Sequence, residues 1–485
     1  MACTQSSAVA ECCAAIYSIG AVDALTIASA VAIACLPFLI DEAFLHPTLL
    51  LLLGIVGICL RVRPERWQLR AAQFGAVLTT SSVLLRHTFW VPRLPLFVLT
   101  FFSALISFVL SLMAPHVAFV KPDGPYSVGR RTVELVDTSR RAWIAAETNG
   151  PRRIPVDIYY PCATVSARRP TFVAAELLRA VCVEFSLPTW AFAHVAAATL
   201  PAQEGAPPLP PPADAAGDAG WPLVLFSHSL TGIRMQNTNL MLHLASHGFV
   251  CATVDHPYEA ILTLFEDGTT AAFLFESALP RPITPTDTLR FRQRCVQYRA
   301  DDLSFVRACL TAASAGEVPR DNEHPPPRRR ARSPPKPRPH ATSEDEHLSF
   351  LRHLLRSGDR RALVIGHSCG GGGALLFAQQ HPESCAGCVS LDGYFWWLGR
   401  EQVLAGISVP LLAVHAPQFI NDADECLCSN VQLTHQLALS SDASAAVHVV
   451  EVGVGHFDFT DITAIGVSPL LLRMAGIQKV GFTWR

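Results

Sequence analysis

The segment GHSCG at residues 366–370 has the pattern G-x-S-x-G, which holds a serine on a sharp turn in many hydrolases. A short apolar run at residues 362–365 precedes it, and a glycine-rich stretch with helical character begins at Gly371. In this strand–turn–helix setting the hydroxyl is presented at the top of a sheet, and the helix N-terminus directs N–H groups at developing negative charge. The pattern therefore predicts Ser368 as the nucleophile of an acyl-transfer reaction. A phosphate-binding loop fits poorly because no Gly-Lys-Ser/Thr follows the glycines.

A serine nucleophile needs a general base, and in this arrangement the chain order is serine, acid, histidine. The loop GVGHF at residues 453–457 places His456 directly after the predicted last strand, residues 446–452. That is where the base is expected. Other downstream histidines follow the elbow helix directly or lie in predicted strands and helices, namely His381, His415, His435 and His448.

Two positions compete for the acid that orients the base. Asp392 follows the predicted strand at residues 387–391, the first strand after the elbow helix. Asp422 and Asp424 follow the next predicted strand, residues 409–414, and this later position is the commoner one among α/β-hydrolases at large. Spacing alone leaves the choice between the two positions open.

The tetrahedral intermediate of acyl transfer needs two backbone N–H donors, together called the oxyanion hole. The residue after the nucleophile, Cys369, supplies one of them. The other should come from the loop FSHSLTG at residues 226–232, which leaves an early strand, and Leu230 is the candidate there.

Short apolar runs alternate with helical patterns along the part of the chain that carries these residues. Predicted strands lie at residues 222–227, 249–254, 362–365, 387–391, 409–414 and 446–452, and predicted helices at residues 235–246, 291–312, 347–355 and 371–380. Alternation of this kind indicates βαβ units and a mostly parallel central sheet. With the serine elbow at its centre, the sequence predicts an α/β-hydrolase fold.

The overall composition excludes several classes of protein. Of the 485 residues, 50% are hydrophobic and only 16% are charged, and the formal net charge is −2. A nucleic-acid binder that acts through charge is therefore not expected, and neither is a wholly disordered chain. The 15 cysteines are odd in number and irregularly spaced, so most are expected to be free thiols.

The hydrophobic excess lies within residues 1–120, which are predicted to form an all-helical transmembrane region of three or four spans. The stretches without formal charge are residues 24–40, 43–60, 71–85 and 94–115. A bilayer-spanning helix needs about 20 mostly apolar residues, so the third stretch is the weakest candidate. A buried soluble hairpin is the alternative.

Four arginines between the second and third stretches, Arg61, Arg63, Arg66 and Arg70, mark that loop as cytoplasmic under the positive-inside rule. With four spans, the rest of the chain is cytoplasmic as well, whereas three spans would place it on the other side. Residues 121–485 are predicted to form the hydrolase domain. Two disordered insertions are expected in it, a Pro/Ala/Gly-rich one at 201–220 and a basic, Pro-rich one at 313–347.

Four motifs in this order, WPLVLFSHSLTG, GHSCGGG, SLDGYFWWLG and VGVGHFDFTD, resemble those of the platelet-activating-factor acetylhydrolase family of α/β-hydrolase lipases. The resemblance runs from about Pro122 to Thr460. It implies calcium-independent cleavage of short or oxidised sn-2 acyl chains from phospholipids. It also implies Asp392 as the acid beside Ser368 and His456, and it supports Leu230 and Cys369 as the oxyanion donors.

Two residues depart from the family's pattern. Members usually have glycine at the position of Ser229 and an aromatic residue at the position of Cys369. The departures leave the three expected catalytic residues intact but bear on the shape of the acyl pocket.

The expected function is thus a serine hydrolase that forms an acyl-enzyme on Ser368. Its expected partners are a phospholipid substrate and the membrane, with no nucleic acid, and neither a metal nor an organic cofactor is implied. Two alternatives stay open, a membrane-tethered carboxylesterase acting on other substrates and a catalytically idle membrane scaffold.

Overall fold

The chain forms two units in the computed structural model, described here as the helical unit and the sheet unit. The helical unit comprises the described residues up to 117 together with 172–198, and the sheet unit comprises the described residues of 119–171 and 199–461. The structure describes residues 21–39, 42–62, 66–84, 93–113, 117, 119–143, 149–164, 168–184, 186–211, 220–274, 284–317, 348–356, 360–416, 430–441 and 447–461.

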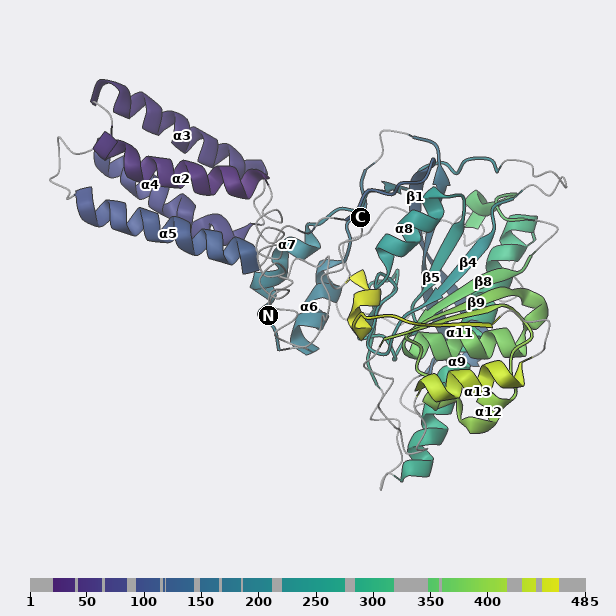
Figure 1. The fold of residues 1–485 in the computed structure, drawn as a ribbon. Coiled ribbons are helices and arrows are strands. Elements are labelled where there is room, and N and C mark those ends of the chain that lie inside the picture. The colour runs from purple at the N-terminus through teal and green to yellow at the C-terminus, as the bar shows by residue number, and fades with distance from the viewer. Residues whose placement is uncertain are drawn as a thin grey trace. The chain divides into compact units, whose positions relative to one another are not determined.

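Four helices pack against one another in the helical unit (Figure 1): α2 (Ala21–Leu39), α3 (Glu42–Val62), α4 (Arg70–Leu84) and α5 (Arg93–Met113). A short turn η1 (Trp67–Leu69) leads into α4. Residues 172–198 add α6 (Ala175–Glu184), η2 (Thr189–Phe192) and α7 (Ala193–Ala196). Within the described residues, α3 and α5 are long and apolar enough to cross a bilayer, and residues 22–37 of α2 form a shorter apolar segment.

Helix α5 carries its polar residues inward and its apolar residues outward. Thr100, Ser103, Ser107 and Ser111 recur at helical spacing and are all buried. The Ser107 hydroxyl accepts a hydrogen bond from the Ala72 N–H in the first turn of α4 at 2.9 Å, and the Thr100 hydroxyl donates to the Gly75 carbonyl at 3.1 Å. Large apolar side chains on the opposite faces are exposed, among them Leu94, Val98, Phe102, Leu105, Ile106 and Val109.

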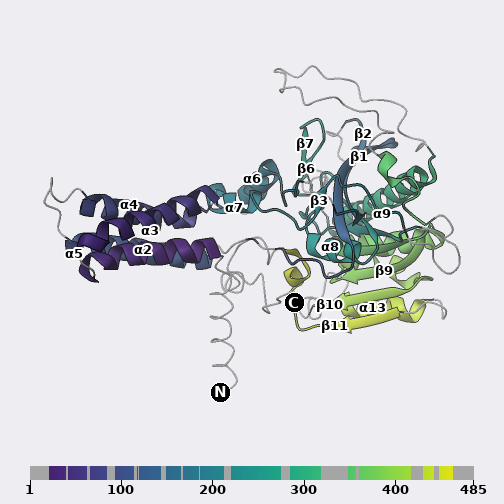
Figure 2. The same cartoon turned by 90° about the horizontal axis from the view of Figure 1, so that it is seen from above.

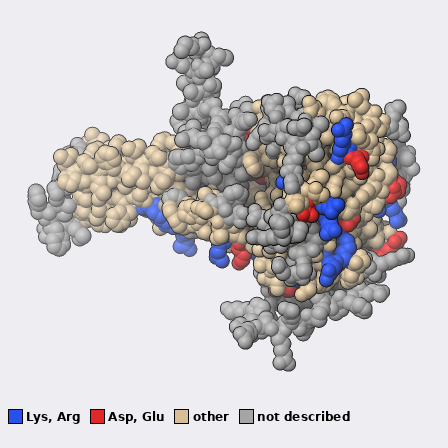
Figure 3. Space-filling model, turned by 90° about the horizontal axis from the view of Figure 1, so that it is seen from below, with Lys and Arg blue, Asp and Glu red and all other residues tan. Residues whose placement is uncertain are grey.

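Helix α4 shows the same reversal, since Gln73, Thr79 and Thr80 are buried while Phe74 and Val77 are exposed. The face of α2–α5 seen in Figure 3 is almost free of charged side chains. A helix bundle in water shows the opposite pattern, with apolar residues inside.

Arg66 is not a free loop charge, contrary to its use in the topology prediction. Its guanidinium is buried and forms an ion pair with Asp23 of α2, with Nε 3.2 Å from Oδ1. Arg61 and Arg70 are exposed, and Arg63 lies outside the described residues. The positive charge available to orient this loop is therefore smaller than the sequence indicates.

The sheet unit is built on a nine-stranded sheet with the order β11-β10-β9-β8-β4-β5-β2-β1-β3. The strands β4, β5, β8, β9, β10 and β11 pair in parallel, and β2 pairs antiparallel with both β5 and β1. Figure 2 shows β11 and β1 towards opposite edges. The bounds are β1 (Ser127–Arg141), β2 (Pro151–Cys162), β3 (Gln203–Glu204), β4 (Leu223–Ser227), β5 (Val250–Val254), β8 (Ala362–His367), β9 (Cys385–Leu391), β10 (Leu411–His415) and β11 (Val447–Glu451).

Helices and short turns complete the sheet unit: α8 (Thr238–Ser246), α9 (Pro285–Ala315), η4 (Ser349–Leu351), α11 (Cys369–Gln380), η5 (Pro382–Ser384), η6 (Phe395–Leu398), α12 (Arg400–Leu404), α13 (Asn430–Ser440) and η8 (His456–Phe459). A separate hairpin pairs β6 (Leu262–Leu264) with β7 (Thr270–Ala272). The mostly parallel sheet with its crossover helices confirms the predicted fold class.

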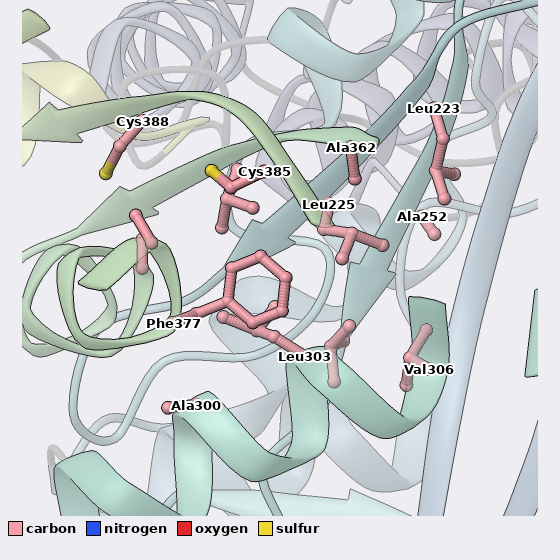
Figure 4. Close-up of a cluster of buried hydrophobic side chains, with 14 of the residues drawn as sticks. Leu223, Leu225, Ala252, Ala300, Leu303, Val306, Ala362, Phe377, Cys385 and Cys388 are labelled. Carbon is pink, nitrogen blue, oxygen red and sulfur yellow. The ribbon is translucent and has the colours of Figure 1, made fainter. Parts of the chain in front are cut away.

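The main core lies between the sheet and the helices α9 and α11. Leu223 and Leu225 of β4 point into it together with Leu303 of α9 and Phe377 of α11 (Figure 4). Because side chains alternate along a strand, Val224 and Phe226 of β4 point to the other face and are also fully buried. Burial on both faces explains why the strands are continuous apolar runs in the sequence.

Three sequence predictions need correction. The sequence predicts a helix over residues 347–355, but of its described residues only Leu348 is α-helical, and the short turn η4 follows it. Within the expected insertion at 201–220, residues 201–211 are placed, and β3 pairs with β1 because its backbone completes the sheet edge. At the start of the insertion expected at 313–347, residues 313–317 are placed, because α9 continues to Ala315 and is capped by Gly316 with φ of 77°. Residues 212–219 and 318–347 lie outside the described residues.

Candidate active site

The predicted serine elbow forms at the centre of the sheet. Strand β8 ends at His367, Ser368 adopts φ of 56°, and α11 begins at Cys369. A positive φ is unfavourable for a residue with a side chain, and such strain concentrates at functional sites. Ser368 is held in place by three backbone hydrogen bonds: its N–H donates to the Leu391 carbonyl at 3.1 Å, and its own carbonyl accepts from the N–H groups of Tyr394 at 2.8 Å and Gly371 at 2.9 Å.

Both glycines of the motif are required because neighbouring backbone atoms lie too close to leave room for a Cβ atom. A Cβ atom at Gly366 would lie 2.1 Å from the Gly370 carbonyl oxygen, and one at Gly370 would lie 2.1 Å from the Ser227 carbonyl oxygen at the end of β4. Neither backbone atom can move without displacing a central strand or the start of α11.

We expect Gly370→Ala to lower the free energy of unfolding by about 3 kcal/mol or more, at or above the upper end of typical overpacking costs. Gly387→Ala in β9 is the matched control, because a Cβ there meets its nearest atoms, in the Leu363 side chain and the Pro410 carbonyl, at an ordinary 3.4 Å. Thermal unfolding of both variants measures the difference. Equal stability of the two variants would contradict the close packing at the elbow.

The structure brings the predicted acid and base together. His456 Nδ1 lies 2.5 Å from Asp392 Oδ2, and both side chains are buried. Asp392 follows β9 with φ of 46°, and its Oδ1 accepts a hydrogen bond from the Ala416 N–H at 2.9 Å. His456 begins η8 after β11, as the sequence predicted, and its ring lies against that of His367 with centroids 4.6 Å apart. Asp422 and Asp424 lie outside the described residues.

The other histidines considered from the sequence occupy different surroundings. His381 directly follows the elbow helix α11, and His435 lies within α13. His415 is buried at the end of β10, where its Nε2 is 3.0 Å from the Thr434 hydroxyl, and His448 lies within β11.

Of the predicted oxyanion donors, Cys369 follows Ser368 directly, and its thiol lies beside the Leu230 backbone N–H and the Ser368 side chain. Burial raises the pKa of the Cys369 thiol to about 11, and hydrogen bonds from the Leu230 backbone N–H and the Ser368 hydroxyl offset only part of that rise. The Cys369 side chain thus links the loop that carries Leu230 to the serine elbow. The thiol stays protonated at neutral pH, so it does not compete with the serine as a nucleophile.

Sequence reasoning missed a buried charged network under the turn that carries Leu230. The Arg299 guanidinium of α9 donates to the carbonyls of His228 and Ser229, and its Nε lies 2.6 Å from Glu259 Oε2. The signal was present in the sequence, because Arg299 falls in the apolar spacing of α9 between Val296 and Leu303, where a charge must find a buried partner.

A second Ser-His-Asp chain lies in the same network. Ser227 Oγ is 2.8 Å from His256 Nε2, and His256 Nδ1 is 2.9 Å from Asp302 Oδ2. All three residues have no exposed surface, so no substrate reaches them. Burial, aided by the positive charge of Arg299, lowers the pKa of His256 to about 3, which keeps its ring neutral. This chain therefore fits a structural role beneath the turn.

The sheet order, the elbow at the end of a central parallel strand and the loops that meet there define an α/β-hydrolase fold. A family model described as platelet-activating factor acetylhydrolase, isoform II, matches residues 112–479, about three quarters of the chain. The chain belongs to this family, which confirms the resemblance carried by the four motifs.

The individual relatives have low sequence identity to this chain. Platelet-activating factor acetylhydrolase from Cavia porcellus is 27% identical over 203 residues, which is 41% of this chain and 41% of that protein. The match therefore spans less than half the length of that relative. Among solved structures, a ferulic acid esterase from Streptomyces cinnamoneus is 23% identical, with a TM-score of 0.48, over 73% of this chain and 79% of that one.

Proposed function

We propose that the chain is a serine hydrolase that cleaves the sn-2 ester of phospholipids carrying short or oxidised acyl chains. The observation that carries the proposal is the hydrogen bond between Asp392 and His456 beside the strained Ser368 elbow, in a chain of this family. The three residues come from loops at the carboxyl ends of β8, β9 and β11, the edge where parallel α/β sheets hold their sites.

In the proposed mechanism, His456 Nε2 takes the proton of the Ser368 hydroxyl as its oxygen attacks the ester carbonyl. Asp392 holds the Nδ1–H of the imidazole and stabilises its positive form. The N–H groups of Leu230 and Cys369 bind the oxyanion. His456 then gives the proton to the departing glycerol oxygen, which leaves an acyl group on Ser368. Water, deprotonated by His456, releases the acyl group as a carboxylic acid.

Hydrolysis of phosphatidylcholines with graded sn-2 chains, by the wild type and by Ser368→Ala, tests this function. We expect the wild type to cleave an acetyl chain fastest and the variant to be inactive. Cleavage of dissolved short-chain esters without any phospholipid cleavage would favour the membrane-tethered carboxylesterase. Failure to react with a fluorophosphonate probe would favour the idle scaffold.

The helices α2–α5 form the proposed membrane region, with four spans and with the sheet unit on the cytoplasmic side. The support is the reversed polarity of α4 and α5, whose hydroxyl groups face inward while large apolar side chains face outward. Hydrogen bonding between helices through Ser and Thr is typical of bundles in lipid. At 15 residues α4 is about 22 Å long, shorter than the hydrocarbon core of about 30 Å, so it crosses only with help from its flanks.

Removing the first 121 residues should lower the rate of hydrolysis of phospholipid in bilayers more than that of dissolved esters. An anchor keeps the site close to the membrane and raises the effective concentration of substrate. We therefore expect a chain starting at Pro122 to lose at least about tenfold in activity on vesicle phospholipid and to keep activity on a soluble short-chain ester. Equal losses on both substrates would instead indicate that the helices stabilise the sheet unit.

Protease protection in sealed microsomes tests the proposed side of the membrane. We expect the sheet unit to be digested from outside, because the cytoplasmic face of microsomes is exposed. Protection of the sheet unit would favour three spans, with α4 as the helix that does not cross.

A further inference from the structure

The side chain of Gln236, between β4 and α8, bridges two of the loops that build the candidate site. Its Oε1 accepts hydrogen bonds from the Ser229 N–H at 3.0 Å and from the Ser229 hydroxyl at 2.9 Å. Its Nε2 lies 2.8 Å from Nδ1 of His367, the residue before Ser368. One amide thus touches both the turn that carries Leu230 and the serine elbow.

The hydrogen-bond donors and acceptors that link Ser229, Gln236 and His367 can be arranged in only one way. The Ser229 backbone N–H can only donate, so the atom that faces it is the amide oxygen of Gln236. The amide nitrogen therefore donates to His367 Nδ1, which must be an acceptor, and the ring proton sits on Nε2. That proton points to the His456 carbonyl at 2.9 Å, a group that can only accept. Burial lowers the pKa of His367 well below its ordinary value and keeps the ring neutral as this arrangement requires, and His456 acts in the same direction whenever its own ring is protonated.

The backbone of Gln236 holds the same loop from a second point. Its carbonyl accepts a hydrogen bond from the Asp461 N–H at 2.8 Å, just after the turn η8 that begins at His456. A side-chain substitution leaves this bond in place, so the loop stays docked when only the amide is removed.

The Gln236 amide fits beside Ser229 because residue 232 is a glycine. A Cβ at Gly232 would lie 2.2 Å from Gln236 Oε1 and 2.8 Å from the Ser229 hydroxyl. Ser229 is one of the two departures from the family pattern, and its hydroxyl is used here to bind Gln236. Gly232, Ser229 and Gln236 therefore form one local arrangement.

We propose that Gln236 is a positioning residue that ties the oxyanion turn, the serine elbow and the backbone of His456 into one hydrogen-bonded unit. The inference rests on the proposed function. Catalytic groups must be held within about 0.5 Å of their productive geometry, and donors in an oxyanion hole act mainly in the transition state. Loss of the bridge should therefore lower kcat and leave KM nearly unchanged.

The test compares full-length Gln236→Leu with Gln379→Leu, using 4-nitrophenyl acetate as a dissolved substrate. Gln379 is the matched control, a half-buried glutamine whose amide bridges the carbonyls of Gln402 and Gly406 away from the site. We expect Gln236→Leu to lower kcat about 10- to 100-fold, less than the 10²- to 10³-fold loss from removing an oxyanion donor outright. KM should change less than about twofold, and Gln379→Leu should lose stability but keep kcat.

Two further variants separate the halves of the bridge. Gln236→Glu keeps acceptors for Ser229 but cannot donate to His367 Nδ1, so we expect a loss of kcat close to that of Gln236→Leu. Gly232→Ala should reproduce the loss by displacing the amide, with the Gln236 side chain still present.

A kcat of Gln236→Leu within twofold of the wild type would overturn the inference, and so would an equal loss in Gln379→Leu. Failure of the proposed function looks different, because the wild type would then be inactive or Ser368→Ala would retain its activity. The two failures are therefore distinguished in one experiment.

Discussion

Ser368→Ala should lower kcat by about 10⁶, because removing one member of a catalytic triad disables the whole unit. The fold should be unaffected, since the backbone hydrogen bonds that hold Ser368 do not use its hydroxyl. The rate of hydrolysis of 1-alkyl-2-acetylglycerophosphocholine measures the loss, and thermal unfolding checks the fold. Retention of more than about a tenth of the wild-type rate would refute the enzymatic proposal.

Ser227→Ala is the sharpest control for this prediction. Ser227 belongs to the other Ser-His-Asp chain, whose members are fully buried. We expect the variant to lose stability, because a buried hydrogen bond to His256 is removed, and to stay within about tenfold of wild-type turnover. Loss of activity in Ser227→Ala together with an active Ser368→Ala would reverse the assignment of the two serines.

The second large effect is expected at the acid, where Asp392→Asn should lower kcat about 10⁴-fold. Asp392 Oδ1 accepts from the Ala416 N–H, so the oxygen of an asparagine stays at Ala416 and its NH₂ group turns to His456 Nδ1. Nδ1 must then accept, which moves the ring proton to Nε2, the nitrogen that has to take the proton of Ser368. The steady-state rate of ester hydrolysis measures the effect.

Asp422→Asn and Asp424→Asn serve as controls and should change kcat only mildly. Both residues occupy the later position that is commoner among α/β-hydrolases, and spacing in the sequence did not exclude them. If either substitution costs about 10⁴-fold while Asp392→Asn is mild, the acid is misassigned.

The sequence by itself determined the parts of the site that are local. The serine elbow is a strand, a sharp turn and a helix joined without a break, so neighbouring residues specify it. The alternating apolar runs likewise determined the mostly parallel sheet, because a strand buried on both faces must be apolar throughout. The position of His456 followed from chain order, since the base is carried by the loop after the last strand.

Only the tertiary structure decided which residues meet across the loops. Spacing left candidate acids after two successive strands and the family resemblance implied Asp392, but only the structure places the Asp392 carboxylate against the Ala416 N–H and His456 Nδ1. The partners of the buried Arg299 and of Gln236 lie far from them in sequence, so no local pattern indicates which groups the two side chains contact. The same holds for α4 and α5, where composition predicts apolar helices but only packing decides that the hydroxyl groups face inward. Local patterns specify elements, whereas hydrogen bonds between elements depend on register and packing angle, which the fold fixes as a whole.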